Sequence, residues 1–105
     1  MTDIKTLNDN LRKTFTGGQV LLTAGIDSMS LDDKANILSM VRNFNDFNEG
    51  NDPYNEHDFL SIDYKGNKIF AKIDYYDLNY EFMSENPADP AVTNRVLTIM
   101  LAEEW

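Results

Sequence analysis

The sequence predicts an α+β domain, in which helices pack on a small antiparallel sheet of three strands, with a fourth strand as an open alternative. Residues 59–74 alternate between apolar and polar side chains on either side of a turn, which is typical of a hairpin. Two earlier segments, 3–15 and 30–47, repeat apolar residues at helical spacings. Each element must bury its apolar side against another layer, so we expect the order α-β-α-β-β-α within a single domain, residues 1–105.

The first helix is expected over residues 3–15, where an apolar stripe is formed by Ile4, Leu7, Leu11 and Phe15. Thr2 or Asp3 can cap its first turn, and Gly17-Gly18 ends it. The short apolar segment 19–23 then predicts the first strand.

The second helix is expected to begin after Ser30, a suitable N-cap, with Asp33 completing an approximate capping box. We expect this helix to run to about Phe47. The following stretch, Asn48–Pro53, is rich in turn-forming residues, and the proline disfavours a helical conformation at residue 52. An irregular segment therefore separates this helix from the hairpin.

The hairpin is expected to pair strands 59–64 and 69–74 around the turn 65–67, Lys-Gly-Asn. In each strand, alternate apolar side chains point to one face, so one side of the hairpin can cover a core. The open edge of such a sheet can also recruit a second chain, which leaves a homodimer as one alternative.

The segment after the hairpin is harder to assign. Residues 78–83 fit either a ragged strand or a short helix. Beyond them, Asp89 as N-cap and Pro90 in the first helical position predict a last helix. Its apolar face is broad, which suits packing against the sheet.

Length and composition limit the classes of protein that this chain can represent. At 105 residues a single core is normal. The sequence has no apolar run near the ~20 residues that span a bilayer, and its first residues lack the pattern of a signal peptide, so we expect a cytoplasmic protein. The absence of cysteine excludes disulfides, thiol catalysis and thiolate metal sites.

The net charge of −9 is unevenly distributed. Residues 43–64 contain six acids and residues 73–94 contain five, and neither run contains Lys or Arg. Direct binding to nucleic acid or to anionic membranes is disfavoured, because both depend on basic side chains. A partner with a basic surface is favoured by long-range attraction. Alternatively, the acidity serves solubility alone.

The stretch Asn51–Phe59 holds the only histidine and suggests the candidate site. Side chains at adjacent positions diverge, so a metal or acid–base site would need residues from elsewhere, and the best set is Asp52, His57 and Asp74. One histidine with carboxylates suits Mg²⁺, Mn²⁺ or Fe²⁺, but the spacing matches no metal motif. The structural alternative is that Asp52 caps a turn, His57 donates to a loop carbonyl and Asp58 accepts backbone amides, which together hold the loop closed. We expect no cofactor.

Tyrosines lie among the acids of both runs. Acidic residues interleaved with tyrosine suit the binding of basic proteins, because tyrosine supplies rigid contact area at a small entropic cost. The alternative is that each ring packs in the core with its hydroxyl at the surface. The candidate partner-binding residues are Asp46, Glu49, Asp52, Tyr54, Glu56, Asp58, Asp63, Asp74, Tyr76 and Asp77.

Several motifs resemble those of one family. They are N-D-P-x-x-E-H-D-F at 51–59, K-I-D-Y-Y-D at 72–77, and T-x-R-V-L-T-I-M-L-A within 87–105, together with L-N-D-x-x-R at 7–12 and L-T-A-G-I at 22–26. This pattern is similar to that of small uncharacterised bacterial proteins, often carried by plasmids and phages. The resemblance implies a shape and a context, and no established activity.

These observations lead to three hypotheses of function. The first is a small acidic inhibitor, a DNA mimic, that blocks the basic nucleic-acid-binding surface of a host defence protein, of the anti-CRISPR or anti-restriction type. The second is a hydrolase or metal-binding enzyme that uses Asp52, His57 and Asp74. The third is a structural or regulatory dimer built through the open sheet.

Overall fold

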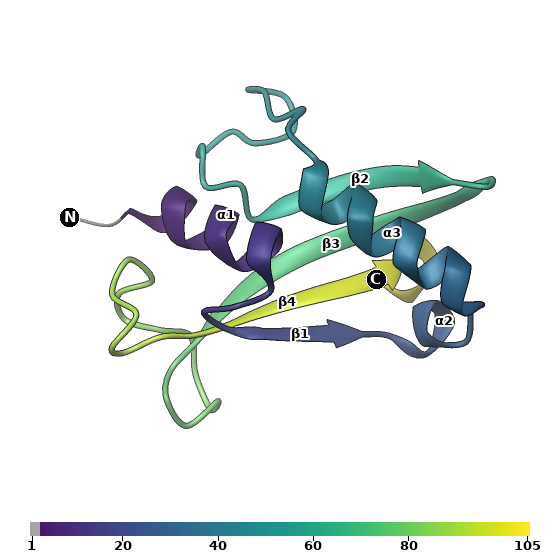
Figure 1. The fold of residues 1–105 in the computed structure, drawn as a ribbon. Helices are drawn as coiled ribbons and strands as arrows, with labels where there is room; N and C mark the ends of the chain where they lie inside the picture. Colours follow the sequence, from purple (N-terminus) through teal and green to yellow (C-terminus); the bar gives the residue numbers. More distant parts are fainter. Residues whose placement is uncertain (1–2) are drawn as a thin grey trace.

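The structure is a computed structural model and describes residues 3–105. Figure 1 shows α1 and α3 lying over the same face of a single sheet, with long irregular segments at its margins. In chain order the elements are α1 (Ile4–Thr14), β1 (Gln19–Leu22), α2 (Ala24–Asp27), α3 (Leu31–Asn43), β2 (Phe59–Tyr64), β3 (Asn67–Tyr76), β4 (Asn94–Leu101) and the 3₁₀ helix η1 (Ala102–Glu104). The predicted α+β class is confirmed, with four strands in the sheet.

The sheet has the strand order β1-β4-β3-β2. β2, β3 and β4 form an antiparallel meander, and β1 pairs in parallel with β4. The chain thus crosses from one edge of the sheet to the other through α2 and α3, and returns strand by strand until β4 fills the space beside β1. The predicted hairpin is confirmed, and its turn residues Lys65 and Gly66 both have positive φ, as a tight two-residue turn requires.

Strand alternation divides the sheet into two different faces. In β3, every second side chain from Ile69 to Tyr75 is buried under the helices, whereas those between them, from Phe70 to Tyr76, lie on the opposite face. We call that opposite face the open face. The buried core comprises Leu11, Ile26, Ile37, Val41, Leu60, Ile62, Ile69, Ala71, Ile73, Tyr75, Leu97 and Ile99.

The helix predicted after Pro90 was wrong, because residues 94–101 form the strand β4. A continuous apolar run fits a buried central strand as well as a buried helix, so its periodicity does not distinguish the two. β4 is such a strand, since it pairs on both sides and is buried along most of its length. Asp89 caps a turn instead, with its carboxylate accepting the amide of Ala91 at 2.9 Å.

Three other features differ from the prediction. α3 ends at Asn43 rather than near Phe47, and α2 was not foreseen. Residues 78–83 form neither a helix nor a strand, apart from an isolated bridge between Met83 and Tyr76. The predicted caps Asp3 and Ser30 are confirmed, while Thr2 lies outside the described residues. No helix among residues 3–105 has both the length and the apolar character to cross a membrane.

The strand assignment of residues 94–101 predicts that neighbouring positions differ sharply in their tolerance of alanine. Ile99→Ala empties a fully buried site and should lower the free energy of unfolding by about 2–5 kcal/mol. Thr98→Ala alters the open face and should cost less than about 1 kcal/mol. Urea unfolding of both variants measures the difference, and equal losses would contradict the alternation.

Candidate functional site

The irregular segment 44–58, which contains the only histidine, is held together by Asp52. This side chain is buried, with 8% of its surface exposed. Its Oδ1 accepts the backbone amides of Glu56 at 3.1 Å and His57 at 3.2 Å. These bonds close a turn, as in the structural interpretation of the sequence, and they leave Asp52 little surface for a partner.

His57 is enclosed by two carboxylates and an aromatic ring. Its Nδ1 lies 2.8 Å from Oδ1 of Asp9, and its Nε2 lies 3.5 Å from Oδ2 of Asp52. The imidazole stacks on the Phe47 ring, with centroids 3.9 Å apart and planes inclined by 7°. Both ring nitrogens face carboxylates, so the expected bond from His57 to a loop carbonyl is replaced by contacts with Asp9 and Asp52 that orient the loop.

Asp9 is supplied by α1, which also supplies the buried Arg12. One Arg12 nitrogen donates to the main-chain carbonyls of Val41, Arg42 and Phe44 at 2.8–3.2 Å. The other terminal nitrogen donates to Asp9 at 2.9 Å. Since these carbonyls lie at the end of α3, where helical amide donors run out, Arg12 supplies them with a donor and binds α1 to the start of the following loop.

A second buried network joins α1 to the sheet. Asn8 accepts a hydrogen bond from Nε of Arg95 at 2.9 Å and donates to the Tyr75 hydroxyl at 2.8 Å and the Glu56 carbonyl at 3.0 Å. The Tyr75 hydroxyl donates to the Glu56 carboxylate at 3.2 Å, and Arg95 also donates to the Pro87 carbonyl. Burial raises the pKa of Tyr75, so its hydroxyl keeps the proton that it donates. We call this network and the contacts of Arg12, Asp9, His57 and Asp52 together the α1 clamp.

The structure separates the three residues considered for a metal or catalytic site. Asp52 and His57 meet within the α1 clamp. Asp74 lies on the open face, where its carboxylate pairs with the Lys72 ammonium at 3.1 Å. Among residues 3–105, no group of three or more His, Cys, Asp or Glu side chains is arranged to hold a metal ion.

The open face carries a groove of about 590 Å³. The floor is formed by alternate residues of β4, namely Val96, Thr98 and Met100. Tyr76 and Tyr80 line one end, and their ring centroids lie 6.0 Å apart. We call this hollow the open-face groove.

The other end of the open-face groove is lined by Trp105. This ring packs edge-to-face on Phe59 and Phe70 at centroid distances of 5.7 and 5.9 Å, and the Lys72 ammonium lies 5.3 Å from its centre. Trp105 nevertheless remains 70% exposed. The groove is therefore apolar at its base and aromatic at both ends, and the main charges near it are Asp74, Lys72 and Glu104.

Beside the groove, residues 77–92 form a projecting segment that we call the 77–92 loop (Figure 1, green to yellow-green). Its apolar side chains are outside the core: Phe82 is 71% exposed, Met83 63% and Leu78 55%. Together with Asp77 and Glu85 they line a hollow of about 330 Å³. The side chain of Asp77 caps the first turn by accepting the amides of residues 79 and 81.

The predicted partner-binding residues fall into separate places. Five lie exposed or half-exposed on segment 44–58, namely Asp46, Glu49, Tyr54, Glu56 and Asp58. Asp63, Asp74 and Tyr76 lie on the open face, and Asp77 begins the 77–92 loop. Sequence reasoning missed the apolar members of the surface, Leu78, Phe82, Met83, Val92 and Trp105. The available signal was a cluster of apolar residues, without regular periodicity, inside an acidic run.

The α1 clamp predicts a specific dependence of stability on pH. Burial raises the pKa of Asp9, but hydrogen bonds from His57 and Arg12 outweigh it and hold the pKa below its ordinary value of 3.8. The folded state thus binds this proton less readily than the unfolded state. The stability that the ionised Asp9 carboxylate contributes is present above pH 3.8 and is lost as the pH falls through the pKa of Asp9 in the folded state. Asp9→Asn should cost about 1 kcal/mol at pH 7 and progressively less in acid.

Asp58 is expected to affect the free energy of unfolding in the direction opposite to Asp9. Burial and the neighbouring Asp52 and Asp74 raise its pKa above 3.8. The ionised Asp58 carboxylate opposes folding at pH 7, so Asp58→Asn should raise the free energy of unfolding at pH 7, and this gain should vanish below pH 3.8. Urea unfolding between pH 3 and 7 measures both variants, and parallel curves for the two would contradict these assignments.

Comparison with known proteins places the chain in a family without assigning an activity. The family model described as a protein of unknown function (DUF3768) matches residues 22–104, which include all four strands at least in part. No curated protein and no solved structure matches the chain. The matched span covers most of the chain, and the protein therefore belongs to the DUF3768 family.

Proposed function

We propose that this protein is a non-enzymatic binding protein that docks on a basic, partly apolar surface of another protein. The observation that carries the proposal is the 77–92 loop, which exposes Leu78, Phe82 and Met83 between carboxylates. Apolar side chains clustered on a surface mark interaction sites more often than chance exposure does. The adjoining open-face groove extends this surface with aromatic side chains, which dominate the binding energy of many interfaces.

The charge of the 77–92 loop indicates the chemistry of the partner. Asp77, Glu81, Glu85 and Asp89 lie on it without a single Lys or Arg. None of the ion pairs formed among residues 3–105 involves this loop. A basic surface would supply the missing counter-charges and would be attracted before contact, while the apolar residues provide the short-range contact.

A more specific proposal follows from the same charges. Many basic protein surfaces bind nucleic acid, so a partner of this protein would lose such a surface on docking. We propose that the partner is a nucleic-acid-binding protein of a defence system, of the CRISPR or restriction type, and that the protein acts as its inhibitor. The cytoplasm as its compartment, and plasmids and phages as carriers of the family, belong to this proposal. The net charge of −9 supports it.

The enzymatic alternative finds no comparable support in the described part of the chain. Asp52 and His57 are used by the α1 clamp, and Asp74 pairs with Lys72 on the open face. His57 keeps 19% of its side chain exposed, but both of its ring nitrogens already face carboxylates, which supports the binding proposal over a role as general base.

Paired variants of the 77–92 loop test the proposed function. Phe82→Ser with Met83→Ser removes the apolar contact, and Glu81→Lys with Glu85→Lys reverses the charge. Both should keep the melting temperature within a few degrees, because exposed substitutions usually cost no more than about 0.5 kcal/mol each. Both should reduce capture of basic proteins from bacterial lysate at least about tenfold, as measured by quantitative mass spectrometry.

The matched control is Leu31→Ser with Asp32→Lys, which changes one exposed apolar and one acidic residue at the start of α3. It should capture the same proteins as the parent. Equal capture by the parent and both loop variants would contradict the proposal. If the blocked surface of the partner binds nucleic acid, excess duplex DNA should displace the captured partner. Retention of the partner would contradict the proposal that it is a nucleic-acid-binding protein, but not the proposal that the 77–92 loop binds a basic protein.

A further inference from the structure

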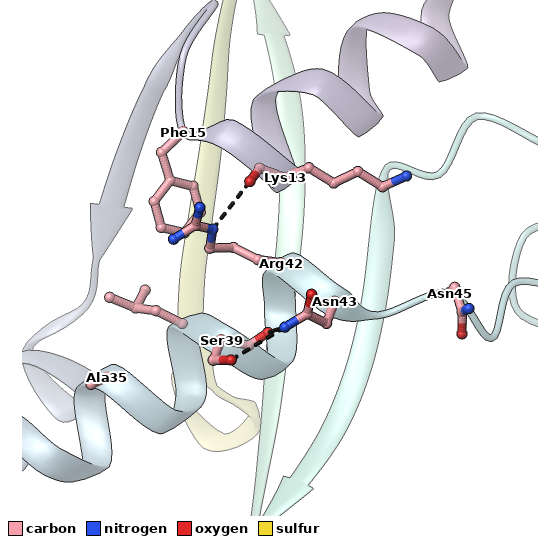
Figure 2. A pocket seen from close by; sticks show the side chains of 8 residues that line it. Lys13, Phe15, Ala35, Ser39, Arg42, Asn43 and Asn45 are labelled. Atoms are coloured by element: carbon pink, nitrogen blue, oxygen red, sulfur yellow. Dashed lines mark hydrogen bonds between the residues drawn. The ribbon is translucent and has the colours of Figure 1, made fainter.

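A hollow of about 660 Å³ lies between the end of α1 and α3, and none of its lining residues belongs to the 77–92 loop. Figure 2 shows the Phe15 ring, from the end of α1, beside the Arg42 guanidinium, with Ser39 and Asn43 along α3 and the Lys13 side chain extending away from Arg42. No Asp or Glu is among its lining residues. In a protein of net charge −9 this is a local basic surface, and we call it the basic hollow.

Arg42 is held in place on one side of the basic hollow. Its Nε donates to the main-chain carbonyl of Lys13 at 3.1 Å, and its guanidinium carbon lies 5.1 Å from the centre of the Phe15 ring. Phe15 itself has φ 57°, an uncommon conformation for a bulky residue, and this backbone turn ends α1 next to Arg42. Among residues 3–105, the two terminal nitrogens of Arg42 donate to no acceptor. A positioned guanidinium with free donors suits an oxyanion.

The other residues that line the basic hollow indicate which kind of oxyanion it fits. Phe15, Ala35 and Leu38 contribute apolar surface, which a strongly hydrated phosphate does not match. The hollow also lies at the C-terminal ends of α1 and α3, where the helix dipoles are negative and oppose a dianion more than a monoanion. A carboxylate carries a single charge, can pair with the guanidinium through two hydrogen bonds and can be attached to an apolar body.

We propose that the basic hollow binds a small organic monocarboxylate with an apolar body. Arg42 pairs with the carboxylate, and the apolar body lies against Phe15 and Leu38. The Lys13 ammonium points away from Arg42 in Figure 2, so it contributes positive potential rather than a second direct bond. The hydrogen bond from Arg42 Nε to the Lys13 carbonyl explains why Arg42 lies near α1. This bond uses one donor of the guanidinium and leaves the two terminal nitrogens for a ligand.

Titration with hexanoate, followed by ¹⁵N NMR, tests this proposal. The Arg42 Nε signal and the Asn43 side-chain amide should shift with saturation at a dissociation constant in roughly the millimolar range, as expected of so small a ligand. Hexanamide has the same apolar body without the charge, and inorganic phosphate has charge without the apolar body. Both should bind at least about fivefold more weakly. Equal binding of hexanamide, or tighter binding of phosphate, would overturn the proposal.

Variants locate the binding to the basic hollow. Arg42→Gln should abolish saturable binding, and Lys13→Gln, which keeps the main-chain carbonyl that Arg42 contacts, should weaken it by about two- to threefold. Lys68→Gln removes an exposed charge outside the lining and should bind like the parent. The amide spectrum of each variant reports whether it is folded. Unchanged hexanoate binding by folded Lys13→Gln and Arg42→Gln would contradict the assignment, as would loss of binding in Lys68→Gln.

Discussion

The buried guanidinium of Arg12 is the interaction on which the arrangement of this fold depends. It lies on α1, yet its acceptors are the last carbonyls of α3, the first carbonyl of the loop that follows and the carboxylate of Asp9. Replacing the cation with an apolar side chain would leave those buried carbonyls without donors, which is more costly than the loss of one hydrogen bond. Arg12 therefore determines where α3 ends and where segment 44–58 begins.

From that point the α1 clamp continues to the sheet. The Asp9 carboxylate contacts both Arg12 and His57, and His57 and Asp52 fix segment 44–58. Asn8, on the same helix, bonds to Arg95 and Tyr75 on the central strands. Asp9, Asp52 and His57 are therefore occupied by folding. The open face and the 77–92 loop are not, and this division of tasks is why we place the proposed interaction on them.

Local sequence signals were sufficient for elements whose ends are determined by their own residues. Asp3 and Ser30 cap their helices as predicted, and the turn at Lys65 forms the predicted hairpin. The sequence could not show that α3 stops at Asn43, because the donor that ends it comes from another helix. It could not identify 94–101 as a strand either, since burial on both faces removes the alternation by which strands are recognised. Of the three residues considered for a metal or catalytic site, Asp52 and His57 lie together, but His57 also contacts the distant Asp9 rather than Asp74, which no local pattern indicates.

We infer that the Arg12 contacts hold α1, α3 and segment 44–58 together. The free energy of unfolding of Arg12→Met tests this role, measured in urea beside Lys5→Met, which replaces a less buried cation on the same helix. We expect Arg12→Met to lower the free energy of unfolding by about 3–5 kcal/mol and to accelerate amide exchange across residues 44–58, and we expect Lys5→Met to change it by less than about 0.5 kcal/mol. Similar free energies of unfolding for the two variants, with segment 44–58 equally protected from amide exchange in both, would contradict this role of Arg12.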